Sequence, residues 1–200
     1  KGREKFQVDF ILIKLQRPNL KELFAKQCEH ILMLTDRAEK LVIDDKSIST
    51  MMSGELLGLV SALKRAVLNY YKQSQEELDF RIEEQNAEKV RIALGENNTI
   101  KIPKFFFSSE KVVIMECING IKVTRIIHTK YLERKEIADS IAHAYIDLVF
   151  NKGVVWADPH PGNILYSYED SQTSMIDLNP CYVWDTKIRE EFKHLIYRLI

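Results

Sequence analysis

Three oxygen-bearing side chains stand at fixed spacing in the last quarter of the sequence. Asp158 and Asn163 lie in the stretch WADPHPGNILY (156–166), and Asp177 follows Asn163 after fourteen residues. Proline fixes φ and glycine admits backbone conformations that other residues avoid, so this stretch is predicted to form a shaped loop. His160 is expected to hold the loop by hydrogen bonds rather than to transfer a proton. Phosphoryl transfer requires a carboxylate that orients the attacking oxygen, together with oxygen ligands for Mg²⁺. The spacing favours that chemistry over carboxylates scattered in loops.

A lone lysine interrupts an apolar segment near the start of the sequence. Residues 5–16 are rich in β-branched and aromatic side chains and are predicted to form a buried strand that contains Lys14. A buried ammonium group needs a partner. Glu83 falls on a helical stripe with Phe80, and Glu77 lies one turn before Phe80. Either glutamate is therefore a candidate partner for Lys14. Two simpler interpretations stay open: a lysine that reaches solvent at a strand end, and a solvated acidic helix face.

The segment VIMECING (113–120) is an apolar strand that runs into a short polar connector. An edge of this kind could bind adenine between two lobes through its backbone groups. A plain hairpin is the alternative interpretation of the same residues.

The remaining elements are predicted from periodicity and from turn residues. Apolar residues recur every three or four positions from Met52 to Leu94, which indicates one long helix or two in series. The last helix is predicted to bury Ile188, Phe192, Leu195 and Leu199. The order of strand, helices, hairpin, helix, hairpin and helix indicates an α+β fold. The other expected elements are a helix at 19–34, a loop at 42–50, a hairpin at 100–120, a helix at 133–151, strands at 163–167 and 173–177, and the last helix at 186–200.

Composition limits the classes of function. The 200 residues carry a formal net charge of zero, which argues against a broad nucleic-acid surface, and they suffice for one domain or two small lobes. The three cysteines have no zinc-site spacing, and no run of 18 apolar residues occurs. The sequence starts at Lys1 rather than at methionine, so we expect it to be part of a longer polypeptide.

Five segments resemble the UbiB atypical kinase-like family of ubiquinone biosynthesis: ILIKLQRPN, EELDFRIEEQNA, VVIMECINGIKV, ADPHPGNIL and MIDLN. The resemblance implies a protein-kinase-like, two-lobed fold with an incomplete N-lobe and a C-lobe that is cut short. Residues 1–118 would form the partial N-lobe, with the lysine strand, a helical insertion, the glutamate-bearing helix and the hinge hairpin. Residues 119–200 would form the partial C-lobe, with the catalytic loop and the metal-binding hairpin.

The resemblance also implies roles for the residues that would face a nucleotide. Lys14 would contact the α- and β-phosphates of ATP, and Glu77 or Glu83 would hold Lys14. Met115 would be the gatekeeper, and Glu116 to Ile118 would lie beside adenine. The strands and the phosphate loop that the family has before the lysine, and its Lys-x-Gly-Gln extension, are not in this sequence.

The same resemblance assigns the catalytic loop. Asp158 would stand at the catalytic-base position, and Asn163 and Asp177 would bind Mg²⁺. Asn179 stands where the family has the glycine of Asp-Phe-Gly, and asparagine tolerates positive φ better than most residues. Trp156 stands where the family often has histidine.

The family implies ATP binding and ATPase or unorthodox kinase activity in support of ubiquinone or related lipid metabolism. The expected location is the matrix side of the mitochondrial inner membrane, or a plastid or bacterial membrane, with a lipid surface and proteins of a larger complex as possible partners and no nucleic acid. A degenerate pseudokinase that acts as a binding or assembly module is the alternative. A small-molecule kinase of the aminoglycoside or choline type is a further one, because DPHPGN fits the Asp-x-His-x-x-Asn loop of those enzymes.

Overall fold

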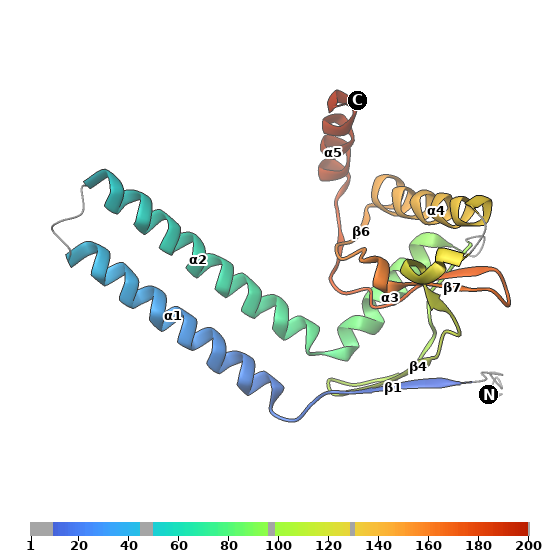
Figure 1. Ribbon diagram of the computed structural model, residues 1–200, viewed down its shortest axis with the longest axis horizontal. Helices are drawn as coiled ribbons and strands as arrows, with labels where there is room; N and C mark the ends of the chain where they lie inside the picture. The colour runs from blue at the N-terminus through green and yellow to red at the C-terminus, as the bar shows by residue number, and fades with distance from the viewer. Residues whose placement is uncertain (1–9, 45–49, 96–98, 129–130, 200) are drawn as a thin grey trace. The chain divides into compact units, whose positions relative to one another are not determined.

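A computed structural model of the chain describes residues 10–44, 50–95, 99–128 and 131–199 (Figure 1). The chain divides into two compact units. The helical unit is Gln16–Asp79, and the mixed unit consists of residues 1–15 with residues 80–200. Part of the predicted strand at 5–16 lies outside the described residues.

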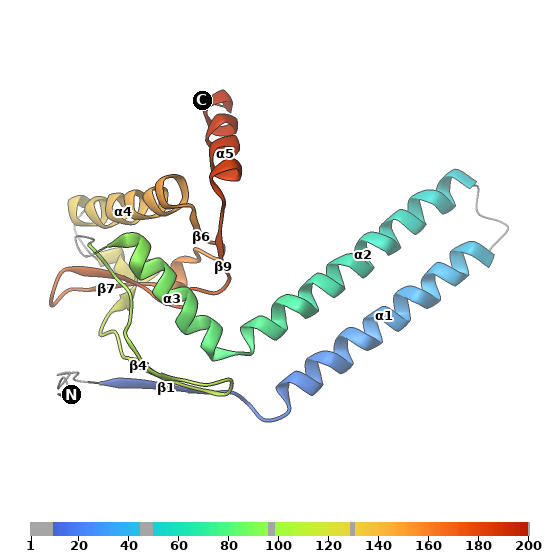
Figure 2. The same cartoon turned by 180° about the vertical axis from the view of Figure 1, so that it is seen from behind.

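The helical unit consists of α1 (Leu20–Asp44) and α2 (Thr50–Glu77), which run side by side in opposite directions (Figures 1 and 2). Cys28 and Val67 are buried in it. Lys64 on α2 forms ion pairs with two carboxylates of α1, so charge as well as apolar packing links the two helices.

The helices of this unit differ in extent from the prediction. The helix expected at 19–34 continues to Asp44, so the expected loop at 42–50 starts too early. The apolar repeat from Met52 to Leu94 is two helices in series, which confirms the second of the two predicted alternatives, and the break lies at Leu78 and Asp79. The Gln16 side chain donates a hydrogen bond of 2.6 Å to the Leu78 carbonyl.

The mixed unit contains a three-stranded antiparallel sheet that carries the lysine strand. Strand β4 (Val112–Glu116) lies between β1 (Ile11–Leu15) and β3 (Phe105–Ser108). In the β1–β4 register Lys14 stands opposite Val113. Cross-strand partners point to the same face of a sheet, so the register decides which side chains accompany the lysine.

Helix α3 (Phe80–Leu94) follows the break and buries one stripe. The stripe mixes polar with apolar side chains, and its buried members are Glu83, Asn86, Ala87 and Val90. A carboxylate and an amide on a buried face need partners inside the unit.

A second sheet has the strand order β2-β8-β7-β5, and β6 pairs with β9 in a third, two-stranded sheet. The hairpin of β7 and β8 is antiparallel, with Ile164 opposite Met175, whereas β2 runs parallel to β8. This hairpin brings Asn163, at the end of the loop that precedes β7, next to the segment that contains Asp177. The strands are β2 (Ile100–Lys101), β5 (Ile121–Lys122), β6 (Val154–Trp156), β7 (Ile164–Ser167), β8 (Gln172–Met175) and β9 (Cys181–Val183).

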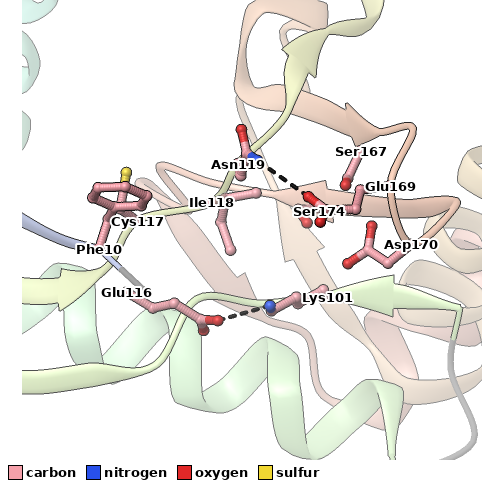
Figure 3. A pocket seen from close by; sticks show the side chains of 10 residues that line it. All are labelled: Phe10, Lys101, Glu116, Cys117, Ile118, Asn119, Ser167, Glu169, Asp170 and Ser174. Atoms are coloured by element: carbon pink, nitrogen blue, oxygen red, sulfur yellow. Dashed lines mark hydrogen bonds and ion pairs between the residues drawn. The ribbon is translucent and has the colours of Figure 1, made fainter. Parts of the chain in front are cut away.

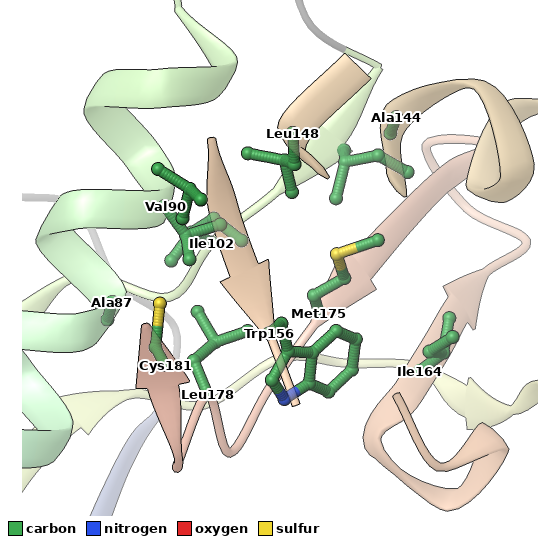
Figure 4. Close-up of a cluster of buried hydrophobic side chains, with 12 residues drawn as sticks. Ala87, Val90, Ile102, Ala144, Leu148, Trp156, Ile164, Met175, Leu178 and Cys181 are labelled. Carbon is green, nitrogen blue, oxygen red and sulfur yellow. The ribbon is translucent and has the colours of Figure 1, made fainter. Parts of the chain in front are cut away.

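The core of the mixed unit lies between α3, the second sheet and α4 (Tyr131–Ile146) with its π-helical extension η2 (Asp147–Lys152). Trp156, Leu148 and Met175 are fully buried at its centre (Figure 4). Among the described residues, no helix combines the length and apolar character needed to cross a lipid bilayer.

Helix α5 (Thr186–Leu199) contradicts one prediction. It begins as expected, because the Asp185 carboxylate accepts a hydrogen bond of 2.8 Å from the Ile188 amide and so caps the helix. The apolar face expected to be buried is not, since no described residue of α5 is buried. Only Phe192 makes ring contacts, with Phe150 and Trp184. An apolar stripe predicts that a helix has an apolar face, but burial of that face requires another element to pack against it.

Candidate active site

An ion pair joins the lysine strand to α3. Lys14 Nζ lies 2.5 Å from Glu83 Oε1, and the Glu83 side chain is only 4% exposed while that of Lys14 is 31% exposed. Of the two candidate partners for Lys14, the structure therefore brings Glu83 into contact. Glu77 is exposed and belongs to the helical unit, where its carboxylate accepts a hydrogen bond from Gln73.

Burial raises the pKa of the Glu83 carboxyl above its ordinary value, and the negative charge of Asp177 raises it further. The Lys14 ammonium opposes both effects by stabilising the carboxylate. Because the charge of Asp177 acts on Glu83, the two carboxylates share one electrostatic environment. The lysine strand, α3 and the segment after β8 thus contribute charges to a common region of the mixed unit.

Local hydrogen bonds shape the loop that carries Asp158 and Asn163. As predicted, His160 organises it: its Nδ1 accepts from the Gly162 amide at 3.0 Å, and its carbonyl accepts from the Asn163 amide at 2.8 Å. The His160 amide in turn donates to the Asp158 carbonyl at 2.7 Å. A Cβ atom at position 162 would lie 2.7 Å from His160 Nδ1, so a larger residue there would force the His160 ring to move.

The β7–β8 hairpin brings Asn163 and Asp177 to the same end of two paired strands. The Ile176 amide donates a hydrogen bond of 2.9 Å to the Asn163 carbonyl, one position before Asp177. Asp177 has a φ of 54°, which is uncommon outside glycine. The positive φ thus occurs at Asp177, whereas Asn179, which could tolerate it, does not adopt it.

The donor set suits a metal ion that is shared with phosphates. Within the described residues, no group of three or more His, Cys, Asp or Glu side chains could hold a metal ion by itself. Mg²⁺ is commonly bound through one or two carboxylates plus substrate phosphates rather than in an all-protein cage. The oxygens of Asn163 and Asp177 fit that mode, and Asp158 lies on the same loop as Asn163.

Met115 and Glu116 lie on opposite faces of the β1–β4 pair. Met115 stands opposite Leu12, and it shares a face with Lys14 because side chains alternate along a strand. The Glu116 carboxylate instead forms an ion pair of 2.7 Å with Lys101 on β2. The Glu116 side chain is therefore already paired within the mixed unit.

A cavity of about 390 Å³ opens beside this connector (Figure 3). Cys117 and Ile118 belong to its wall, and the buried Ser167 and Ser174 lie on its far side, on β7 and β8. Its complete lining is Phe10, Lys101, Glu116, Cys117, Ile118, Asn119, Ser167, Glu169, Asp170 and Ser174. Sequence reasoning missed Lys101, although a lysine between Ile100 and Ile102 is the same kind of signal as Lys14 in its strand.

The sequence matches the ABC1 atypical kinase-like domain over residues 4–200. An "AarF domain-containing kinase 1" of Drosophila melanogaster is 38% identical over 93 residues, which are 44% of this chain and 18% of the relative. An "AarF domain-containing protein kinase 1" of Mus musculus is 27% identical over 198 residues, which are 95% of this chain and 35% of the relative. A "Probable protein kinase UbiB" of Photobacterium profundum is 28% identical over 138 residues, which are 67% of this chain and 25% of the relative.

The chain spans about a fifth to a third of the length of these relatives. A solved structure of Rv3197 with erythromycin, from Mycobacterium tuberculosis, resembles the chain with a TM-score of 0.63 at 21% identity, over 94% of this chain and 47% of the other. At that identity the likeness concerns the fold, which is an α+β kinase-like fold present in part. With the match over residues 4–200, the chain belongs to the UbiB-type ABC1 atypical kinase-like family.

Proposed function

We propose that the protein binds ATP with Mg²⁺ and hydrolyses it or transfers its terminal phosphoryl group. The observation that carries the proposal is the ion pair of 2.5 Å between Lys14 and the buried Glu83. A buried carboxylate that holds an ammonium group in place at the end of a strand would position that ammonium to bind anionic phosphates. The remaining exposure of the lysine side chain is consistent with a group that is available to a ligand.

Each remaining polar residue has a role in this proposal. Asp158 is the carboxylate that accepts a proton from, or orients, the attacking oxygen. Asn163 and Asp177 hold the metal, which supplies positive charge that stabilises the phosphates. Met115 borders the adenine of ATP, and backbone groups of the connector Glu116–Ile118 bind the edge of the adenine ring. Residues 1–118 and 119–200 are the two partial lobes in this scheme.

The short segment after Asp177 favours a small or lipid acceptor over a peptide. Only seven residues separate Asp177 from Asp185, the cap of α5, and three of them form β9. A long segment that could hold an extended peptide therefore has no room there. We extend the proposal to support of ubiquinone or related lipid metabolism at a mitochondrial, plastid or bacterial membrane, as part of a larger complex.

ATP hydrolysis by the intact natural protein, measured with and without Mg²⁺, tests the proposal. Asp177→Asn is expected to abolish Mg²⁺-dependent hydrolysis, because it removes a charge from the metal position and leaves the volume unchanged. Asp139→Asn is the matched control, since Asp139 is exposed on α4 and forms an ion pair of 3.5 Å with Lys135 on the same helix. Equal hydrolysis rates for the natural protein and Asp177→Asn would overturn the assignment.

The second candidate is a pseudokinase that acts as a binding or assembly module. The observation that favours it is Asn179, which replaces the glycine of the family's Asp-Phe-Gly. Nucleotide titration of the intact protein separates the two: no stabilisation by Mg-ATP would favour the module. Phosphorylation of a small alcohol would instead favour a small-molecule phosphotransferase.

A further inference from the structure

Two asparagine side chains join α3 to the segment that follows Asp177. Asn86 Nδ2 donates a hydrogen bond of 2.6 Å to Asn179 Oδ1, between positions 93 residues apart in the sequence. Asn86 is 4% exposed and Asn179 is half-buried. Both belong to the mixed unit, so the contact is internal to one compact body.

A neighbouring lysine fixes the direction of this hydrogen bond. Lys89 Nζ donates to Asn86 Oδ1 at 2.9 Å. An ammonium group can only donate, so the oxygen of the Asn86 amide must face Lys89 and its NH₂ group must face Asn179. Asn179 must therefore present its own oxygen, and the three side chains form an ordered chain of donors and acceptors.

The pair connects the two charged parts of the candidate site. Asn86 lies three residues after Glu83 on the same helical face, and Asn179 lies two residues after Asp177. Helix α3 thus directs one buried polar side chain to the lysine strand and a second to the segment that carries Asp177.

Asp177 is held from both sides of its own segment. Before it, the Ile176 amide is bonded to the Asn163 carbonyl at 2.9 Å. After it, Leu178 is buried next to Trp156 in the core (Figure 4), and Asn179 is bonded to Asn86. A non-glycine residue with a φ of 54° persists only where its surroundings determine it, and these contacts are such surroundings.

We propose that Asn86 and Asn179 are a positioning pair that holds Asp177 in its left-handed conformation and sets its place relative to the Lys14–Glu83 ion pair. The proposal rests on the proposed function only where it makes Mg²⁺ binding depend on the pair. Neither asparagine is assigned a contact with nucleotide or metal, so both act through Asp177.

Hydrogen exchange of the intact, nucleotide-free protein tests the positioning directly. Asn86→Ala and Asn179→Ala are each expected to speed exchange of the Ile176 amide on the order of tenfold, because the segment loses one of its anchors. The double variant should exchange no faster than either single variant, since both remove the same hydrogen bond. Asn179→Asp keeps the acceptor and should exchange as the natural protein does.

Asn151→Ala is the control, because the Asn151 amide bonds Asp147 on η2, away from this pair. Unchanged exchange at Ile176 in both alanine variants, or effects that add in the double variant, would overturn the proposal. This measurement needs no ligand, so it decides the positioning role even if the protein binds no nucleotide.

Titration with ATP and Mg²⁺ tests the link to the site. Asn179→Ala is expected to raise the half-saturating Mg²⁺ concentration several-fold at fixed ATP and to leave the Kd for ATP in EDTA unchanged. A general loss of structure would weaken both equally, and that outcome would contradict the positioning role. If the natural protein shows no Mg-ATP binding at all, the proposed function fails while the exchange result stands.

Discussion

A buried carboxylate destabilises a fold unless a cation or hydrogen bonds compensate for its lost hydration, and Glu83 depends on Lys14 for this. Lys14→Met is therefore expected to lower the free energy of unfolding by about 1–3 kcal/mol, because it leaves Glu83 buried without its partner. Lys14→Met combined with Glu83→Gln should lose less than the sum of the two single changes. Urea unfolding of the four proteins measures this coupling, and strictly additive losses would show that the pair contributes nothing.

The same carboxyl predicts a pH dependence with a definite sign. The pKa of Glu83 is raised in the folded protein above its ordinary value of 4.5, so the folded state binds the proton more tightly than the unfolded chain. Stability contributed by Glu83 is fully present below pH 4.5 and is lost as the pH rises through the raised pKa. The unfolding free energy of the natural protein should thus fall relative to Glu83→Gln over that range. A difference that stays constant with pH would contradict the raised pKa.

At the scale of elements, the cap of α5 gives a prediction that is separate from the active site. The Asp185 carboxylate accepts from the Ile188 amide at 2.8 Å, and removing such a cap costs about 1 kcal/mol. Asp185→Ala should lower stability by this amount, and Asp185→Asn should restore most of it because its side-chain oxygen can still accept. Thermal unfolding measures both. No loss in the alanine variant would mean that α5 does not contribute to the cooperative unit.

Elements whose local chemistry is distinctive could be predicted from the sequence. Proline and glycine around His160 predicted a shaped loop, and the β-branched run around Lys14 predicted a strand. The prediction that this strand is buried was wrong, because the apolar side chains of β1 are exposed in the structure. Two helices in series were one of the predicted alternatives, but the position of the break at Leu78 was not predicted, because the apolar repeat continues across it and no proline or glycine marks it. The apolar face of α5 was wrongly predicted to be buried, because periodicity shows that a helix has an apolar face but not whether another element packs against it.

Contacts between elements that are distant in the sequence could not be predicted for a different reason. The Asn86–Asn179 and Lys101–Glu116 contacts depend on strand register and on the placement of α3, which a single sequence does not encode locally. A partial signal existed, since Asn86 is a polar residue three positions after Glu83 on a stripe that also buries Ala87 and Val90. That pattern indicates a partner, but it cannot say which one.

At the scale of the whole molecule, the division into two units predicts where Mg-ATP should act. Lys14, Glu83, Asp158, Asn163 and Asp177 all belong to the mixed unit, whereas α1 and α2 form the helical unit. A ligand that binds the folded state stabilises it by RT ln(1 + [L]/Kd), which is about 2.7 kcal/mol at a hundredfold excess over Kd. Hydrogen exchange with saturating Mg-ATP should therefore slow in β1, β4, α3 and β8 and remain unchanged within α1 and α2.

Lys14→Met is the matched variant for this measurement, because it removes the proposed phosphate contact and leaves the helical unit untouched. Its exchange should be the same with and without Mg-ATP throughout the mixed unit. Protection that is confined to α1 and α2 would place the nucleotide outside the mixed unit. Protection of the mixed unit that survives in Lys14→Met would show that Lys14 does not hold the nucleotide. Either result would contradict a nucleotide site built from β1, α3, the loop of Asp158 and Asn163, and the segment after β8.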